Sequence, residues 1–219
     1  MQVRVFDSLE SLAAASVEYV DGPRVAVSGG TTFATLFRHW APEVRRRVGA
    51  GSTYRFFEVD ERDVPFEDPA CNWKSCVEDL LVPAGLGDQK SHHVRNAAEY
   101  EMLLNAEFKG GPVLFDQVFL GMGEDGHTAS LFPGKDSLRD FDSDVLDVTD
   151  SPKPPPRRVT LGLKPIRAAR TLLLVALGAG KAEMIRRLRA GDESLPVTLA
   201  MKGHPNAVLL LDRAAAGGD

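Results

Sequence analysis

Short apolar runs alternate along the chain with longer segments in which apolar residues recur at helical spacing. The runs predict strands at Val3–Phe6, Arg24–Val27, Tyr54–Val59, Val113–Leu120, Val145–Val148, Arg158–Leu161, Thr171–Leu177 and Ala207–Leu211. The helical spacing predicts helices at Leu9–Tyr19, Thr31–Trp40, Asn72–Leu81, Ala97–Phe108 and Ala179–Arg189. Strands that are apolar on both faces are typical of a parallel sheet covered by helices. The pattern therefore predicts an α/β fold with a mostly parallel sheet.

The Pro-rich segment Ser151–Pro156 is the best candidate for a linker between domains. It is short, and strand patterns continue beyond it. We therefore interpret it as a loop, and expect residues 1–219 to form a single domain.

Four predicted strands are followed by loops rich in glycine or charge, at Ser28–Thr32, Asp60–Pro65, Gly121–His127 and Gly178–Lys181. In open α/β sheets, ligands bind in the crevice at the carboxyl ends of the strands. We therefore expect the chemistry of these four loops to converge in one crevice.

Three of these loops have features suited to an anion. Ser28-Gly29-Gly30-Thr31 joins a strand to a helix, so its backbone N–H groups and the helix dipole can approach an anion, although a tight turn with a threonine N-cap is an equally simple interpretation. Arg62 offers a planar fork that suits phosphate or carboxylate. Lys181 stands at a helix N-terminus, an unfavourable place for a cation unless an anion binds there.

The segment Gly121–Ser130 is the most informative, because three glycines precede His127. Histidine can take or give a proton near neutral pH. Asp125, two positions earlier, is placed to orient one ring nitrogen so that the other acts as a base. The alternative is a histidine that caps a turn.

Other catalytic arrangements are disfavoured. The chain has no Gly-x-Ser-x-Gly elbow, and nothing near Cys71 is expected to lower its pKa. A metal site built from Cys71, Cys76, His92 and His93 is disfavoured, because a cysteine spacing of five is not the short spacing of zinc sites, and adjacent histidines in a polar loop are more often solvated. We expect no metal.

Composition narrows the class of partner. The 219 residues include 26 Lys+Arg and 31 Asp+Glu, a net charge of -5, which disfavours nucleic acid and anionic membranes as partners. A small anion held by a few local cations remains compatible with this charge. With two cysteines, no signal-peptide pattern in Met1–Glu10 and no apolar run longer than Leu172–Leu177, we expect a cytoplasmic protein without a membrane span.

The chain resembles the glucosamine-6-phosphate isomerase/6-phosphogluconolactonase family, and its lactonase branch in particular, over nearly its whole length. The matching segments are Ser28–Thr31, Val59–Pro65, Asn72, Tyr100, Leu120–Gly134, Lys153–Pro155, Arg158–Thr160, Gly178 and Lys181. Departures from the family pattern occur at Phe33, Cys71 and Thr198.

This resemblance implies a modified doubly wound, mostly parallel sheet with helices on both faces. It implies hydrolysis of a sugar-phosphate lactone, 6-phosphogluconolactone, without metal or cofactor, by a monomer or weak homodimer. It assigns the general base to His127, with Asp125 beside it. It assigns phosphate binding to the turn Ser28, Gly29, Gly30 and Thr31, to Arg62 and Lys181, and to Arg158.

Two rival functions remain. An amino-sugar-phosphate deaminase of the same fold resembles Asp-Gly-His-Ile-Ala-Phe-Asn in the histidine loop, where this chain has Thr128-Ala129-Ser130-Leu131 after His127. A non-catalytic sugar-phosphate sensor is expected to have lost the histidine, which is present here.

Overall fold

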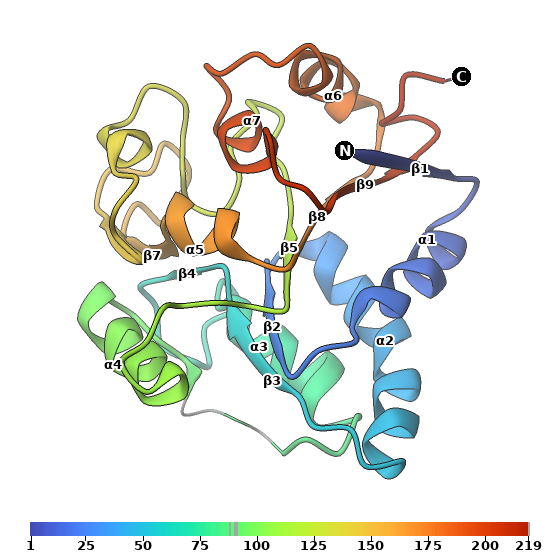
Figure 1. Ribbon diagram of the computed structural model, residues 1–219, viewed down its shortest axis with the longest axis vertical. Coiled ribbons are helices and arrows are strands. Elements are labelled where there is room, and N and C mark those ends of the chain that lie inside the picture. Colours follow the sequence, from blue (N-terminus) through green and yellow to red (C-terminus); the bar gives the residue numbers. More distant parts are fainter. Residues whose placement is uncertain (88, 90–91, 219) are drawn as a thin grey trace.

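The computed structural model describes residues 1–87, 89 and 92–218. Its centre is a sheet of six parallel strands in the order β1-β9-β8-β5-β2-β3 (Figure 1). The strands are β1 (Gln2–Phe6), β2 (Arg24–Val27), β3 (Arg55–Glu58), β5 (Gln117–Leu120), β8 (Thr171–Ala176) and β9 (Ala207–Asp212). The α/β class and the mostly parallel sheet are therefore confirmed.

The apolar strands are explained by two cores, one on each face of the sheet. Successive side chains of a strand point to opposite faces. Val25 and Val27 of β2 accordingly join one core, and Ala26 between them joins the other. Both faces of the inner strands are buried, as their composition predicts.

The helices divide between these two faces (Figure 1). One core is covered by α1 (Leu9–Ser16), α2 (Thr31–Gly49), α3 (Asn72–Cys76) and the π-helical turn η2 (Val77–Leu81). The other is covered by α4 (Ala97–Phe108), α5 (Leu163–Ala168), α6 (Ala182–Arg189) and α7 (Pro196–Met201). Short 3-10 turns lie at η1 (Val17–Tyr19), η4 (Asp136–Arg139) and η5 (Ala179–Lys181).

The sequence predicted the end of α2 too early. The helix continues past Trp40 and through Pro42 to Gly49. Ala41 and Val44 remain on the buried face that Phe33 and Trp40 begin, so their burial holds the helix together beyond the proline.

A second, antiparallel sheet was not predicted. It has the order β4-β7-β6, formed by Asp60–Arg62, Arg158–Leu161 and Val145–Val148. The interpretation of Asp60–Pro65 as a loop is therefore wrong for its first three residues. Val59 links the two sheets, because its N–H donates to Val27 of β2 and its carbonyl accepts from Leu161 of β7. Because the chain passes at Val59 from the main sheet into the second one, Asp60 and Arg62 lie beside the carboxyl ends of the main strands.

Smaller differences concern element ends and short helices. Only Gln117–Leu120 of the predicted strand Val113–Leu120 pairs in the sheet, and α5 and α7 were not expected. Within the part of the chain that the structure describes, no helix is long and apolar enough to cross a membrane.

Candidate active site

A cavity of about 450 Å³ opens at the carboxyl ends of β2, β3, β5 and β8, which are neighbours in the sheet. All four predicted loops reach it. Its lining includes Ser28–Thr32, Asp60, Arg62, Gly121–Gly123, His127 and Lys181, and also Asn72, Lys153 and Arg158. The expected convergence is confirmed, because parallel strands of one sheet deliver their following loops to the same edge.

His127 is held in a fixed orientation at this cavity. Its Nδ1 lies 2.5 Å from Oδ1 of Asp125, and its ring packs against Phe132 with centroids 4.6 Å apart. A Cβ on Gly123 would lie 2.0 Å from Nδ1, so only glycine leaves room for the ring here. Since Asp125 occupies Nδ1, Nε2 is the ring nitrogen available to a substrate.

The electrostatic surroundings keep this pair in complementary protonation states. Burial lowers the pKa of His127, and the hydrogen bond to Asp125 opposes part of that shift. Partial burial raises the pKa of Asp125, but the hydrogen bond to His127 and the Lys153 ammonium, 3.9 Å away, bring it below its ordinary value. At neutral pH the aspartate is ionised and the imidazole is neutral, with its proton on Nδ1 and its lone pair on Nε2.

The Ser28–Thr31 turn has two positions that require glycine. Gly30 is the N-cap of α2 with φ of 89°, a conformation that favours glycine. A Cβ on Gly29 would lie 2.0 Å from Oδ1 of Asn72, so this position also requires glycine. Ser28 Oγ accepts a hydrogen bond from the N–H of Gly121, which ties the turn to the histidine loop.

Asn72 was noted in the sequence only as part of the family pattern. Its Nδ2 donates to the carbonyl of Asp60, while its Oδ1 is buried with no partner among the described residues. A buried polar atom of this kind is costly until a ligand or water pairs with it. The amide therefore offers an acceptor at the cavity wall.

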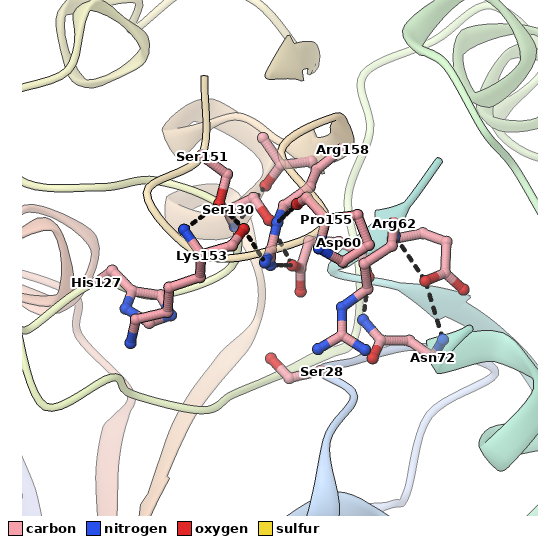
Figure 2. A network of polar contacts seen from close by, with 12 residues as sticks. Ser28, Asp60, Arg62, Asn72, His127, Ser130, Ser151, Lys153, Pro155 and Arg158 are labelled. Atoms are coloured by element: carbon pink, nitrogen blue, oxygen red, sulfur yellow. Dashed lines mark hydrogen bonds and ion pairs between the residues drawn. The ribbon is translucent and has the colours of Figure 1, made fainter. Parts of the chain in front are cut away.

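The cations at the cavity differ in how they are held (Figure 2). Arg62 donates from Nη1 to the carbonyl of Ala70 at 2.7 Å, and its buried Nε has no partner among the described residues. Arg158 is only 6% exposed and donates to the carbonyls of Lys153, Pro154 and Pro155. Arg158 thus lies in the lining as expected, but most of its donors hold the Lys153–Pro155 loop in place.

The same network reaches Asp60. Its Oδ2 accepts a 2.6 Å hydrogen bond from Ser130 and lies 4.0 Å from Nη1 of Arg158 (Figure 2). This network joins the second sheet to the histidine loop.

Lys181 stands where the sequence placed it, at the end of η5 and the N-cap of α6. Burial lowers the pKa of its ammonium, and the nearby Glu124 carboxylate opposes that shift. The preceding turn is pinned by Asp212, whose two carboxylate oxygens accept from the N–H of Gly178 at 3.0 and 2.9 Å.

Lys153 is the cation that sequence reasoning missed. The segment Lys153–Pro155 was quoted as part of the family pattern, but it was interpreted only as an arm for Arg158. The structure brings Lys153 itself into the cavity lining, next to Asp125.

The alternative roles of the cysteine and histidines can now be tested against their surroundings. Burial, with the Glu61 charge, raises the pKa of Cys71 to about 12, so a nucleophilic thiolate is disfavoured as expected. His92 is not solvated: it is 6% exposed, its Nδ1 donates to the Phe56 carbonyl, and its ring stacks on Phe57. That expectation was wrong for His92, because the rings of Phe57 and Trp73 stack on the imidazole and keep water away.

Comparison with known proteins places this chain in a family. A profile for glucosamine-6-phosphate isomerases/6-phosphogluconolactonase matches residues 1–209. The chain belongs to this family. The resemblance seen in the sequence motifs is thereby confirmed, and with it the expectation of an enzyme.

Curated relatives agree with this family membership. A 6-phosphogluconolactonase of Bos taurus is 36% identical over 204 residues, covering 88% of this chain and 79% of the relative. One of Homo sapiens is 34% identical, covering 98% of this chain and 92% of the relative.

The fold is also shared across the family. A 6-phosphogluconolactonase from Trypanosoma cruzi superposes with a TM-score of 0.82 at 25% identity, covering 99% of this chain and 96% of its own. A monomeric glucosamine-6-phosphate deaminase gives a TM-score of 0.76 at 23% identity, covering 99% of both chains. Similarity of fold therefore does not distinguish a lactonase from a deaminase. That distinction has to come from the residues at the cavity.

Proposed function

We propose that the protein hydrolyses 6-phosphoglucono-1,5-lactone to 6-phosphogluconate. The observation that carries this proposal is the His127–Asp125 pair at a cavity that is also lined by Arg62, Lys153 and Lys181. Such a cavity suits a substrate that has a hydrolysable carbonyl at one end and a phosphate at the other. The names of the curated relatives support the same activity.

His127 acts as the general base in the proposed mechanism. Its Nε2 takes a proton from a water molecule while the water oxygen attacks the lactone carbonyl carbon. When the tetrahedral intermediate collapses, the bond to the ring oxygen breaks and the imidazolium returns the proton to that oxygen. Asp125 keeps the second ring nitrogen protonated and stabilises the transient positive charge. A lactone is an activated ester, so no covalent nucleophile is needed.

Phosphate binding has to overcome the charge of the whole protein. With a net charge of -5, the average field repels a dianionic substrate. The local cations Arg62 and Lys181 and the N–H groups of the Ser28–Thr31 turn supply the attraction. Binding energy at the phosphate then positions the carbonyl near His127.

A deaminase is the second candidate, because a deaminase of this family shares the fold. The decisive experiment offers the purified protein two substrates in parallel. We expect rapid hydrolysis of freshly generated 6-phosphoglucono-δ-lactone, measured through a coupled dehydrogenase and corrected for spontaneous hydrolysis. Ammonia release from glucosamine 6-phosphate should stay at background. Ammonia release without lactone hydrolysis would select the deaminase, and tight sugar-phosphate binding without turnover would select a sensor.

We also propose that the reaction needs no metal. His127 and Asp125 are hydrogen-bonded to each other through Nδ1 and Oδ1. Among the described residues, the closely spaced possible metal ligands are Glu61, Cys71 and His93, and none of them lines the cavity. After exhaustive chelation, the protein should keep at least about half of its kcat at a temperature where circular dichroism shows it folded. Loss of kcat in folded protein, restored by zinc, would contradict this.

A further inference from the structure

Behind the cavity wall, β4, the N-cap of α3 and the loop before α4 bring together one carboxylate, one thiol and one imidazole. One ligand atom each from Glu61, Cys71 and His93 lie within 4.8 Å of one another. Asp60 and Arg62 line the cavity, and Glu61 between them points to the opposite side of β4. The cluster is therefore separate from the proposed catalytic pair.

We propose that Glu61, Cys71 and His93 form a structural binding site for a zinc-like divalent ion. Thiolate, imidazole and carboxylate are the three ligand types that zinc takes in proteins. The site takes no part in the hydrolysis and does not depend on the proposed function.

The donor atoms are available in the way a metal ion requires. Nε2 of His93 is buried and has no hydrogen-bond partner among the described residues. The neighbouring His92 is different, because its Nδ1 is engaged by the Phe56 carbonyl. Of the two adjacent histidines, His93 is the one that belongs to the cluster, and it has an uncommitted buried nitrogen.

The thiol of Cys71 points at the carboxylate. Its Sγ lies 3.3 Å from Oε2 of Glu61 and donates its proton there. On metal binding, the S–H bond breaks, the proton leaves to solvent, and sulfur and Oε2 both coordinate the ion in its place.

The Glu61 carboxylate is held ready for this exchange. Its Oε1 accepts from the N–H groups of Arg62 and Asn72, and its Oε2 accepts from that of Trp73. These bonds fix the carboxylate plane, much as outer-shell partners orient ligands in known metal sites.

A second buried carboxyl is an independent observation that favours a cation. Glu58 is 2% exposed, and neither of its oxygens has a hydrogen-bond donor among the described residues. Glu58 ends β3, the strand that leads into β4, so this unpaired buried carboxyl lies only three residues before Glu61.

The test is a cobalt(II) titration of the chelator-stripped full-length protein, compared with Cys71→Ser and Cys76→Ser. Serine is a good N-cap, so Cys71→Ser can keep the hydrogen bond that Sγ now accepts from the N–H of Lys74. Cys76 is the matched control, because it is also buried, ends the same helix and lies outside the cluster.

We expect one equivalent of cobalt to bind the wild type with a thiolate-to-cobalt charge-transfer band. Cys76→Ser should keep this band. Cys71→Ser should lose it, and its affinity should fall by more than the roughly 10–100-fold that loss of an outer-shell partner costs. A wild type without the band, or a band lost with Cys76→Ser and kept with Cys71→Ser, would overturn the proposal.

Two further variants address the remaining ligand and the location. His93→Gln should weaken cobalt binding at least about tenfold, while His127→Gln should leave the band and the affinity unchanged, since His127 lies in the cavity. Zinc should raise the melting temperature of the wild type and not that of Cys71→Ser. Equal cobalt affinity in wild type and His93→Gln, or loss of binding in His127→Gln, would contradict the assigned ligand set.

Discussion

His127→Ala is expected to fold normally and to lose about 10²–10⁴-fold in kcat above the spontaneous rate, the usual contribution of a general base. The ring is oriented by Asp125 and Phe132, and its removal leaves water at the carbonyl without a proton acceptor. The measurement is initial rates of lactone hydrolysis on protein whose melting temperature has been recorded. His39→Ala is the matched control, because His39 is exposed on α2 and lies outside the cavity lining.

The pH dependence separates a base from a merely structural histidine. Burial lowers the pKa of His127 below the roughly 6.5 of an unperturbed histidine, so the neutral, basic form persists to more acidic pH. The kcat/KM of the wild type should therefore be flat near neutrality and fall only below about pH 6.5. The variant should lose this limb together with the rate. A wild-type kcat in His127→Ala would show that the base lies elsewhere.

The sequence was sufficient to predict that the four loops meet in one cavity. The run Leu172–Leu177 is apolar at every position because the inner part of β8 is buried on both faces, and this property is local enough to recognise. Once parallel strands are inferred, their following loops must meet at one edge, and Ser28, His127 and Lys181 do so.

The second sheet was beyond local reasoning. β4 is only Asp60–Arg62, three polar residues whose extended form depends on pairing with β7, nearly a hundred positions later. No periodicity within such a segment distinguishes it from a charged turn. The same holds for Arg158, whose donors are taken up by carbonyls of a loop that folds back onto it. The sequence showed that this loop is basic, but it did not show that the Arg158 guanidinium is hydrogen-bonded to backbone carbonyls of the protein itself.

Arg62 and Lys181 are the two cations proposed to bind the substrate phosphate, and we call them the phosphate anchor. Removing either one should slow the phosphorylated lactone much more than the unphosphorylated one. Arg62→Ala and Lys181→Ala should each lower kcat/KM for the 6-phosphorylated lactone by roughly tenfold to a hundredfold, since a charge-assisted hydrogen bond is worth about 1.5–3 kcal/mol and each factor of ten about 1.4 kcal/mol. The same variants should hardly change kcat/KM for unphosphorylated glucono-lactone, which has no group for the anchor to hold.

The comparison of the two lactones is what makes this result interpretable. Arg62 also donates to the Ala70 carbonyl, so its loss could disturb the fold, but a disturbed fold would slow both substrates alike. Arg139→Ala and Lys202→Ala serve as matched controls, because both side chains are exposed and lie outside the cavity. They should leave both kcat/KM values within about twofold, a difference of well under 1 kcal/mol. An equal loss on both lactones in Arg62→Ala and Lys181→Ala would mean that these residues serve the fold or the carbonyl centre, and the phosphate would have to be bound elsewhere.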